Sequence, residues 1–458
     1  MSDELLVFRS RRVVSPHGVH PAAVHVHGGV INRVSAYDDV AADAPLIDAG
    51  NAILLPGLVD THVHINDPGR TDWEGFESAT LAAAAGGVTT VVDMPLNSVP
   101  ATTTPAALAE KRACAEGHSS VDVGFWGGLV PDNIGELRPL AEAGVLGFKC
   151  FLVPSGVDEF AHVDEADLRR ALPVLAELGL PLLAHAELPA PLASARPVGG
   201  NPRSYARYLA SRPAQAEIEA VELLITLARE TGAHVHVVHV SAAQALAVLR
   251  AARVEGVPIT AETCPHYLHF AAEHVPDGAT EYKCAPPIRG VGNREQLWRA
   301  LASGDLEAIT SDHSPCPAPM KQRDQGTFDE AWGGIASLQL GAAIVWTGAR
   351  RRGYDIAHIA EWMAAAPARL ASLATRKGAI APGCDADLVV FDPDASWTVD
   401  AAQLHHRHPI TPYAGETLTG AVLATYLRGE MIYEAGHAVG AARGRMLTRA
   451  GAGWISRS

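Results

Sequence analysis

Eight short apolar runs, each followed by a stretch long enough for a helix, constrain the fold of this chain more than any other feature of the sequence. The runs lie at residues 59–65, 89–94, 121–129, 148–152, 181–186, 234–240, 258–262 and 308–311. Intervals such as 77–85 and 217–229 are rich in Ala and Leu and suit a helix that crosses between strands. Eight alternating β and α units are typical of a (β/α)8 barrel, so we predict an α/β fold with a TIM barrel over residues 55–376.

Both ends of the chain have a different rhythm. Short β-type runs at 5–8, 23–27 and 30–34 alternate with turn residues, and a similar pattern returns at 377–391. We therefore predict a small β-sandwich domain built from both chain termini, residues 1–54 and 377–458. Within the barrel, residues 187–213 are predicted to be the only long irregular insertion. Such an insertion either covers an active site or is a plain solvated loop.

Composition and charge exclude several classes of partner. The 458 residues contain 36 Lys plus Arg against 51 Asp plus Glu, a formal charge of −15, which argues against nucleic acid and against an anionic membrane. No secretory signal opens the chain and no apolar run reaches membrane-spanning length, so we predict no membrane partner and a cytoplasmic location. The six cysteines are dispersed without C-x-x-C spacing, as expected of reduced thiols.

Six residues with metal-binding or basic side chains stand at the ends of the predicted barrel strands: His62, His64, Lys149, His185, His239 and Asp312. In this fold the active site lies where the strands end. His62 and His64 alternate onto one face of their strand, and two neutral imidazoles so placed can hold a divalent metal. Taken singly, His185 and His239 are equally explained as structural histidines, and Asp312 as a helix cap. Six such groups at one mouth favour a metal centre.

Two other His-x-His pairs serve as internal controls for this interpretation. His25 and His27 lie on a predicted hairpin that turns at Gly28-Gly29, with polar side chains on its wet face. His234 and His236 alternate onto the face of their strand opposite His239. We predict that none of these four is a ligand.

Lys149 is the unusual member of the set, since a buried ammonium would be repelled by a metal cation. Burial and neighbouring metals both lower the pKa of a lysine, which leaves a neutral amine able to take up carbon dioxide. The resulting carbamate has two oxygens and can bridge two metals.

Nine segments together resemble the cyclic amidohydrolases, and within them most resemble the allantoinases. The segments are 55–70, 147–160, 182–187, 236–241, 262–268, 283–289, 311–321, 331–339 and 377–391. The resemblance implies two divalent ions per chain, usually Zn²⁺, with His62, His64 and Asp312 on one ion and His185 and His239 on the other. It also implies a carboxylated Lys149 that bridges both ions, and a homotetramer.

A few positions separate the branches of this family. Dihydroorotases resemble the first motif but carry Arg at the position of Asn66, and hydantoinases typically carry Tyr at the position of Pro154. The resemblance therefore implies a small neutral cyclic ureide as substrate, most simply allantoin, opened to allantoate with Asp312 as the proton acceptor. The rivals are a hydantoinase or dihydropyrimidinase, and a catalytically inactive relative that serves as a scaffold. The predicted substrate-binding residues are Asn66, Asn97, Ser155, Cys284 and Pro286. Ala285 departs from the pattern, because related enzymes often have Ser there.

Overall fold

Eight parallel strands form a barrel in the computed structural model, which describes residues 5–195, 199–434 and 436–449. They are β6 (Leu58–Val63), β7 (Val88–Asp93), β8 with β9 (Asp122–Phe125 and Gly127–Gly128), β10 (Phe148–Phe151), β11 (Leu182–His185), β12 (Val235–Val237), β13 (Ile259–Thr263) and β14 (Ala308–Ile309). Only Trp126 separates β8 from β9, so the two count as one interrupted strand. The barrel closes where Val63 pairs with His313 in parallel, and where His64 N donates to His313 O at 2.8 Å. The predicted barrel is confirmed.

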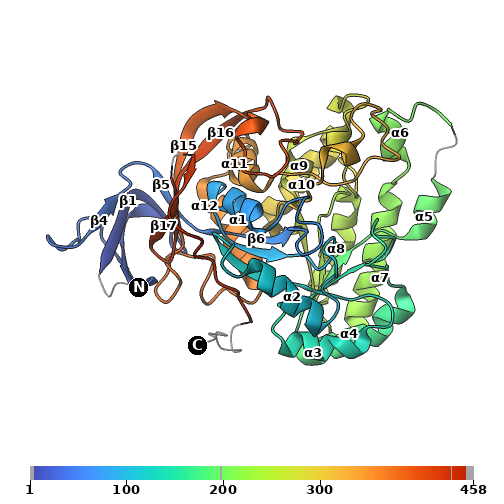
Figure 1. Ribbon diagram of the computed structural model, residues 1–458, viewed down its shortest axis with the longest axis horizontal. Helices are drawn as coiled ribbons and strands as arrows, with labels where there is room; N and C mark the ends of the chain where they lie inside the picture. Colours follow the sequence, from blue (N-terminus) through green and yellow to red (C-terminus); the bar gives the residue numbers. More distant parts are fainter. Residues whose placement is uncertain (1–4, 196–198, 435, 450–458) are drawn as a thin grey trace.

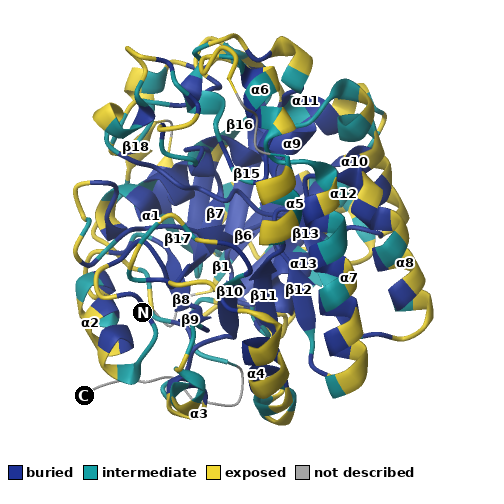
Figure 2. Ribbon diagram, turned by 90° about the vertical axis from the view of Figure 1, so that its right-hand side faces the viewer, coloured by how far each residue is buried: buried dark blue, intermediate teal, exposed yellow. Residues whose placement is uncertain are grey.

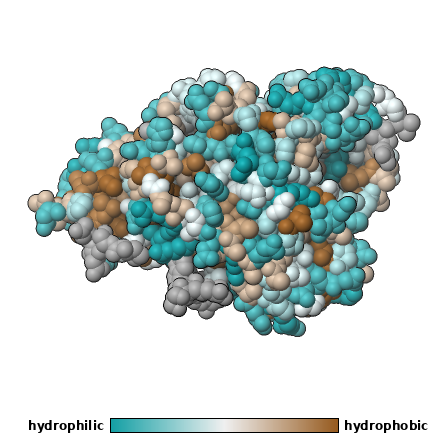
Figure 3. Space-filling view, viewed as in Figure 1, coloured by the Kyte–Doolittle hydropathy of each residue, from teal (hydrophilic) through white to brown (hydrophobic). Residues whose placement is uncertain are grey.

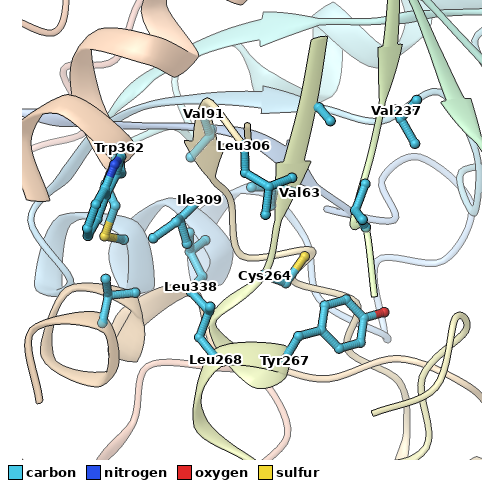
Figure 4. Close-up of a cluster of buried hydrophobic side chains, with 14 of the residues drawn as sticks. Val63, Val91, Val237, Cys264, Tyr267, Leu268, Leu306, Ile309, Leu338 and Trp362 are labelled. Atoms are coloured by element: carbon cyan, nitrogen blue, oxygen red, sulfur yellow. The ribbon is translucent and has the colours of Figure 1, made fainter. Parts of the chain in front are cut away.

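Helices surround the barrel and turn one apolar face inward, as Figure 2 shows by the exposed outer faces around a buried centre. They include α1 (Phe76–Ala85), α2 (Pro105–Ala115), α3 (Leu137–Glu142), α4 (Glu165–Leu178), α7 (Ala214–Thr231), α8 (Leu246–Val254), α10 (Val291–Ser303) and α11 (Gly341–Arg351). In α4, Leu168, Leu172 and Leu175 recur at helical spacing and are fully buried. Asp164 begins this helix with a capping box. Apolar side chains such as Val63, Val237 and Ile309 belong to a buried cluster that also includes residues of the surrounding helices, such as Trp362 (Figure 4).

The two chain ends share one nine-stranded sheet, seen on the left of Figure 1. Its strands are β1 (Leu6–Ser15), β2 (Gly18–His27), β3 (Val30–Ser35), β4 (Leu46–Asp48), β5 (Ile53–Pro56), β15 (Leu388–Thr398), β16 (Thr417–Leu427), β17 (Glu430–Glu434) and β18 (His437–Ala438). β5 pairs with β1 on one side and with β15 on the other. The rings of Phe8 and Tyr426 lie 4.9 Å apart although two strands separate β1 from β16. The sheet therefore folds over on itself into the predicted sandwich.

The junction between the small sheet and the barrel is tight. A Cβ atom at Gly57, between β5 and β6, would lie 2.2 Å from Thr89 Oγ1, so only glycine fits there. Lys377 stands at the same junction, with its Nζ 2.6 Å from both Asp122 of β8 and Asp387 before β15. Arg428 donates to Asp122 at 2.7 Å. A buried charge cluster thus joins the barrel to the sandwich.

The predicted irregular insertion at 187–213 contains two short helices, α5 (Pro189–Ser194) and α6 (Tyr205–Ala210), and the prediction was wrong on this point. Six residues are too few for helical periodicity to show in a sequence. The connection after β14, residues 310–340, is also long and has only the short turns η5 (Ala318–Lys321) and η6 (Leu338–Leu340). The remaining helices are α9 (Pro265–His269), α12 (Ile356–Ala360), the π-helix η7 (Glu361–Ala365) and α13 (Ala366–Leu370).

The surface is mostly hydrophilic on the face shown in Figure 3, with apolar residues gathered at the end formed by β1–β4. Val19, Val30 and Leu46 are among the exposed apolar side chains of this region. Within the described ranges, no helix has both the length and the apolar character needed to cross a bilayer.

Candidate metal centre and substrate cavity

His62, His64 and Asp312 come together where β6 and β14 end. Asp312 Oδ1 lies 3.2 Å from His62 Nε2 and 3.5 Å from His64 Nε2, and one donor atom from each residue lies within 4.8 Å of the others. The two imidazole rings are 5.6 Å apart, as alternation along the strand requires. Three donors this close, all on one side, are suited to a single divalent cation.

A second group lies beside the first. His185 Nδ1 and His239 Nε2 face each other at 3.1 Å, and the His239 ring is 5.4 Å from the His62 ring. Lys149, the second residue of β10, is fully buried beside them, and its Nζ is 5.0 Å from the centre of the Phe151 ring. Phe151 stacks on His185 with ring centres 4.6 Å apart. The structure thus brings all six predicted groups to one mouth of the barrel.

Burial sets the protonation of these groups in the direction that a metal needs. It lowers the pKa of His64 to about 4, and it lowers the pKa of His185 and His239 as well. Burial also lowers the pKa of Lys149 to about 8. For Asp312 burial acts upward, but His62, His64 and His239 outweigh it and hold the pKa of that carboxyl well below its ordinary value. The result is neutral imidazoles beside a carboxylate.

Two buried nitrogens of this cluster, Lys149 Nζ and His239 Nδ1, have no hydrogen-bond partner in the structure. An unpartnered buried amine is costly, and the cost disappears if the amine becomes a carbamate whose oxygens bind cations. Four imidazoles, one carboxylate and a lysine are also the donor types that a pair of divalent ions requires. The residues present therefore fit a binuclear centre.

Two of the candidate ligands, His62 and His185, each have one ring nitrogen within hydrogen-bond distance of a buried glutamate. Neither glutamate was predicted from the sequence. His185 Nε2 lies 2.8 Å from Glu187 Oε2, and Arg212 binds the same carboxylate. His62 Nδ1 lies 2.8 Å from Glu262 Oε1. Burial raises the pKa of a carboxyl, but the bonds from His236 and His62 outweigh it and hold the pKa of Glu262 at about 2. A glutamate at the end of an apolar strand was the signal that could have identified them.

A cavity of about 850 Å³ opens above these groups. The connection after β14 and helix α6 supply much of its wall, including Tyr208, Met320, Gln322, Phe328 and Trp332, which were not predicted. Of the predicted substrate-binding residues, Asn97, Ser155 and Cys284 line the cavity. Asn66 and Pro286 do not.

The predicted substrate-binding residues differ in whether their polar side-chain atoms are already engaged in hydrogen bonds within the protein. Asn66 is buried, and its Nδ2 donates to Pro315 O at 3.4 Å, so its side chain points behind the wall. The Ser155 hydroxyl donates to Phe160 O at 2.6 Å and closes its own loop. Asn97 Nδ2 is 3.4 Å from His64 Nδ1. Asn97 therefore contacts a candidate ligand directly, whereas the Ser155 side chain is already engaged.

Four side-chain hydroxyls fasten the wall segment that contains Cys284. Tyr208 donates to Cys284 O at 2.7 Å, Tyr267 to Pro286 O at 2.7 Å, Ser241 to Pro287 O at 2.6 Å and Tyr205 to Ile288 O at 2.9 Å. Carbonyls held in this way fix the backbone of the segment against the cavity. We call residues 284–288 the fastened segment.

The two control pairs lie away from the cavity, but not entirely as predicted. His25 is buried, and its Nε2 contacts Ser35 Oγ at 2.9 Å. The prediction that its side chain faces solvent was therefore wrong. The pairing of β2 with β3 shifts register between His25 and Val26, so simple alternation does not hold there. His27 is exposed. His236 was predicted not to be a ligand, and its Nε2 lies 3.1 Å from Glu262, the carboxylate that contacts His62.

Left-handed backbone is concentrated at this site. Asn66, Asn97, His239, Asp312 and Gln322 have φ between 40° and 70°, although none is glycine. Such conformations cost roughly 1–3 kcal/mol each and persist where the surrounding structure enforces them. At His239 and Asp312 the turn directs the side chain from the strand end toward the other donors.

Comparison with known proteins identifies the family. The model described as Amidohydrolase family matches residues 53–432. The chain is 53% identical to an allantoinase of Streptomyces avermitilis over 98% of this chain and 100% of the relative, and 44% identical to an allantoinase of Arabidopsis thaliana over 93% and 88%. Among solved structures, L-hydantoinase (dihydropyrimidinase) from Arthrobacter aurescens is 31% identical with a TM-score of 0.91, over 97% of this chain and 99% of that one. These matches show that the chain belongs to the amidohydrolase family and, within it, to the allantoinases.

Proposed function

We propose that this chain hydrolyses allantoin to allantoate at a binuclear metal centre, with Zn²⁺ as the resident ion. The observation that carries the proposal is the convergence of four histidines and Asp312 at one cavity, with the buried and unpartnered Lys149 beside them. His62, His64 and Asp312 would hold one ion, His185 and His239 the other, and a carboxylated Lys149 both. A pair of ions held there would supply the Lewis acidity that activates water and polarises the scissile carbonyl.

Asp312 is the proposed catalytic base. It lies at the cavity floor as a carboxylate, so it can accept the proton of the attacking water and deliver it to the ring nitrogen that leaves. The bond that breaks is the ring C–N bond, and the new bond joins the carbonyl carbon to the water oxygen. The product keeps all atoms of the substrate plus one water.

The cations that line the cavity support a neutral substrate. Arg207 is paired with Asp329 at 2.7 Å, Arg212 is bound to Glu187, and Lys283 donates to Ala331 O at 2.6 Å. Arg207 and Arg212 are therefore already paired with carboxylates and Lys283 is bound to a backbone carbonyl, so a substrate carboxylate would have to compete for each of them. Asn66 is not among the residues that line the cavity, so the preference for a neutral substrate depends on these cations.

The test is a kinetic comparison of allantoin, hydantoin, dihydrouracil and dihydroorotate on protein of known metal content. We expect kcat/KM for allantoin to exceed that for hydantoin and dihydrouracil, because Pro154 and Ser155 leave room for a ureido arm. Dihydroorotate should be disfavoured about a thousandfold or more, since its carboxylate would be desolvated without a partner. A better rate with hydantoin would favour the hydantoinase rival, and metal-free, inactive protein would favour a scaffold.

The homotetramer and the cytoplasmic location stay predictions that rest on the family resemblance and the sequence. Light scattering of the purified protein measures the first. A mass of one or two chains would contradict it.

A further inference from the structure

The control pair His234 and His236 is connected to the candidate metal centre by an unbroken line of hydrogen-bond partners. His234 Nε2 and His236 Nδ1 are each 2.8 Å from Thr260 Oγ1. His236 Nε2 is 3.1 Å from Glu262 Oε2, and Glu262 Oε1 is 2.8 Å from His62 Nδ1. His62, His236 and Glu262 are all at most 1% exposed. The line runs through the barrel from β12 across β13 to β6.

One arrangement of protons gives each contact of this line a donor and an acceptor. A carboxylate accepts at both oxygens, so His62 Nδ1 and His236 Nε2 must both donate to it. His236 Nδ1 then accepts from the Thr260 hydroxyl, whose oxygen accepts from His234 Nε2. Each contact between neighbours in the line then has one donor and one acceptor, as buried polar networks require.

The consequence falls on His62. With a proton held on Nδ1 by Glu262, Nε2 is the ring nitrogen left to bind a metal, and it lies 3.2 Å from Asp312. We propose that Glu262 is a positioning residue that fixes the tautomer and ring orientation of His62 for the metal held by His62, His64 and Asp312, and that His236 holds Glu262 in place. The inference rests on the proposed binuclear centre and extends it beyond the ligands.

Glu262→Gln is the first test, because it keeps the shape and changes the hydrogen bonding. A carboxamide oxygen can accept from only one of the two rings, and the negative charge that makes His62 a better ligand is lost. We expect the variant to release one ion per chain at a chelator concentration at least about tenfold below that for wild type. In cobalt-substituted protein, the visible absorption band should change, while the urea unfolding midpoint of the metal-free chains should be similar.

His234 and His236 provide a matched pair of variants on one strand. Both contact Thr260, but only His236 contacts Glu262. His236→Asn should therefore increase chelator sensitivity in the same direction as Glu262→Gln, and His234→Asn should behave as wild type. If Glu262→Gln cannot be purified in folded form, this pair carries the test alone.

Two results would overturn the inference. One is wild-type metal content and chelator sensitivity in both Glu262→Gln and His236→Asn. The other is an equal loss of metal in His234→Asn and His236→Asn, which would point to general strand stability. Failure of the proposed function would give a different result. A wild-type chain that binds two ions but does not hydrolyse allantoin would contradict the substrate assignment, and it would leave the role of Glu262 unaffected.

Discussion

Lys149 determines at the residue scale whether the centre can hold two ions. Its amine is buried and unpartnered, and burial lowers its pKa to about 8, so a neutral amine is accessible near neutral pH. Lys149→Ala should therefore lose the bridge and retain less than half of the wild-type metal, as measured by elemental analysis. Short-chain carboxylates should restore part of the metal and the activity, because their two oxygens replace those of a carbamate. Full metal content in Lys149→Ala without added carboxylate would contradict a bridging lysine.

The histidine ligands and the control histidines are distinguished by substitution. Asn in place of His62, His64, His185 or His239 removes a donor from a metal and should lower kcat/KM at least about tenfold. His25→Asn serves as the control, since His25 contacts Ser35 on the small sheet and should leave metal content unchanged. A metal-depleted His25→Asn would mean that the assignment of ligands from strand ends is mistaken.

The sequence predicted this centre better than it predicted the supports around the centre. His62 and Asp312 could be assigned because a barrel directs strand ends to one place. The role of Glu262 could not be predicted, because it depends on which ring lies next to its carboxylate. That ring belongs to His62 of β6, which is distant from Glu262 in the sequence. Alternation along the strand predicted that His236 is not a metal ligand. Alternation gives the face of the strand that a residue occupies, but not which other side chains lie beside it there.

At the scale of elements, the fastened segment connects helix α6 to the cavity wall. Helix α6 contributes Tyr208, whose hydroxyl holds Cys284 O at the cavity wall, and Tyr205, whose hydroxyl holds Ile288 O. Loss of one such bond is worth about 1 kcal/mol, or roughly fivefold in an equilibrium constant. Tyr208→Phe should therefore raise KM for allantoin several-fold with metal content unchanged.

Tyr205→Phe is the matched control for this prediction, because Ile288 does not line the cavity. Its effect on KM should be smaller than that of Tyr208→Phe. Steady-state kinetics on both variants checks the difference, and equal KM values in the two would show that α6 acts only on stability.

Elements differ in how far a sequence predicts them. The eight barrel strands were predictable because each lies in a short stretch rich in apolar and β-branched residues, and the hairpin of β2 and β3 because Gly28-Gly29 marks its turn. The cavity wall was not, since α6 is six residues long and the connection after β14 is held by contacts distant in the sequence. One such contact is Lys283 Nζ to Ala331 O.

For the whole molecule, the charge cluster at Lys377 determines how firmly the sandwich is joined to the barrel. Lys377, Asp122 and Asp387 have side chains exposed by 4% or less, and the opposing carboxylates raise the pKa of Lys377 despite its burial. Lys377→Met leaves buried carboxylates without their cation and should lower the free energy of unfolding by about 3–5 kcal/mol. Urea unfolding followed by circular dichroism measures this loss.

An exposed ion pair gives the matched comparison. Arg138 and Glu177 pair on the surface with side chains more than half exposed, so Arg138→Ala should cost about 1 kcal/mol or less. A similar shift for both variants would mean that the buried cluster contributes no more than a surface pair. The division of the chain at residues 54/55 and 376/377 stays a prediction, with β5 ending at Pro56 and β15 beginning at Leu388.

The pairing of β5 with β15 imposes an order of events on the ribosome. β5 is synthesised early, but the strand that covers its second edge begins more than 300 residues later, at Leu388. Throughout synthesis of the barrel, that edge presents unpaired backbone groups of the kind that recruit other chains. The second edge of β5 therefore stays open to pairing with other chains until β15 has been synthesised. A chaperone that shields strand edges should raise the yield of folded protein more than one that acts on the finished chain.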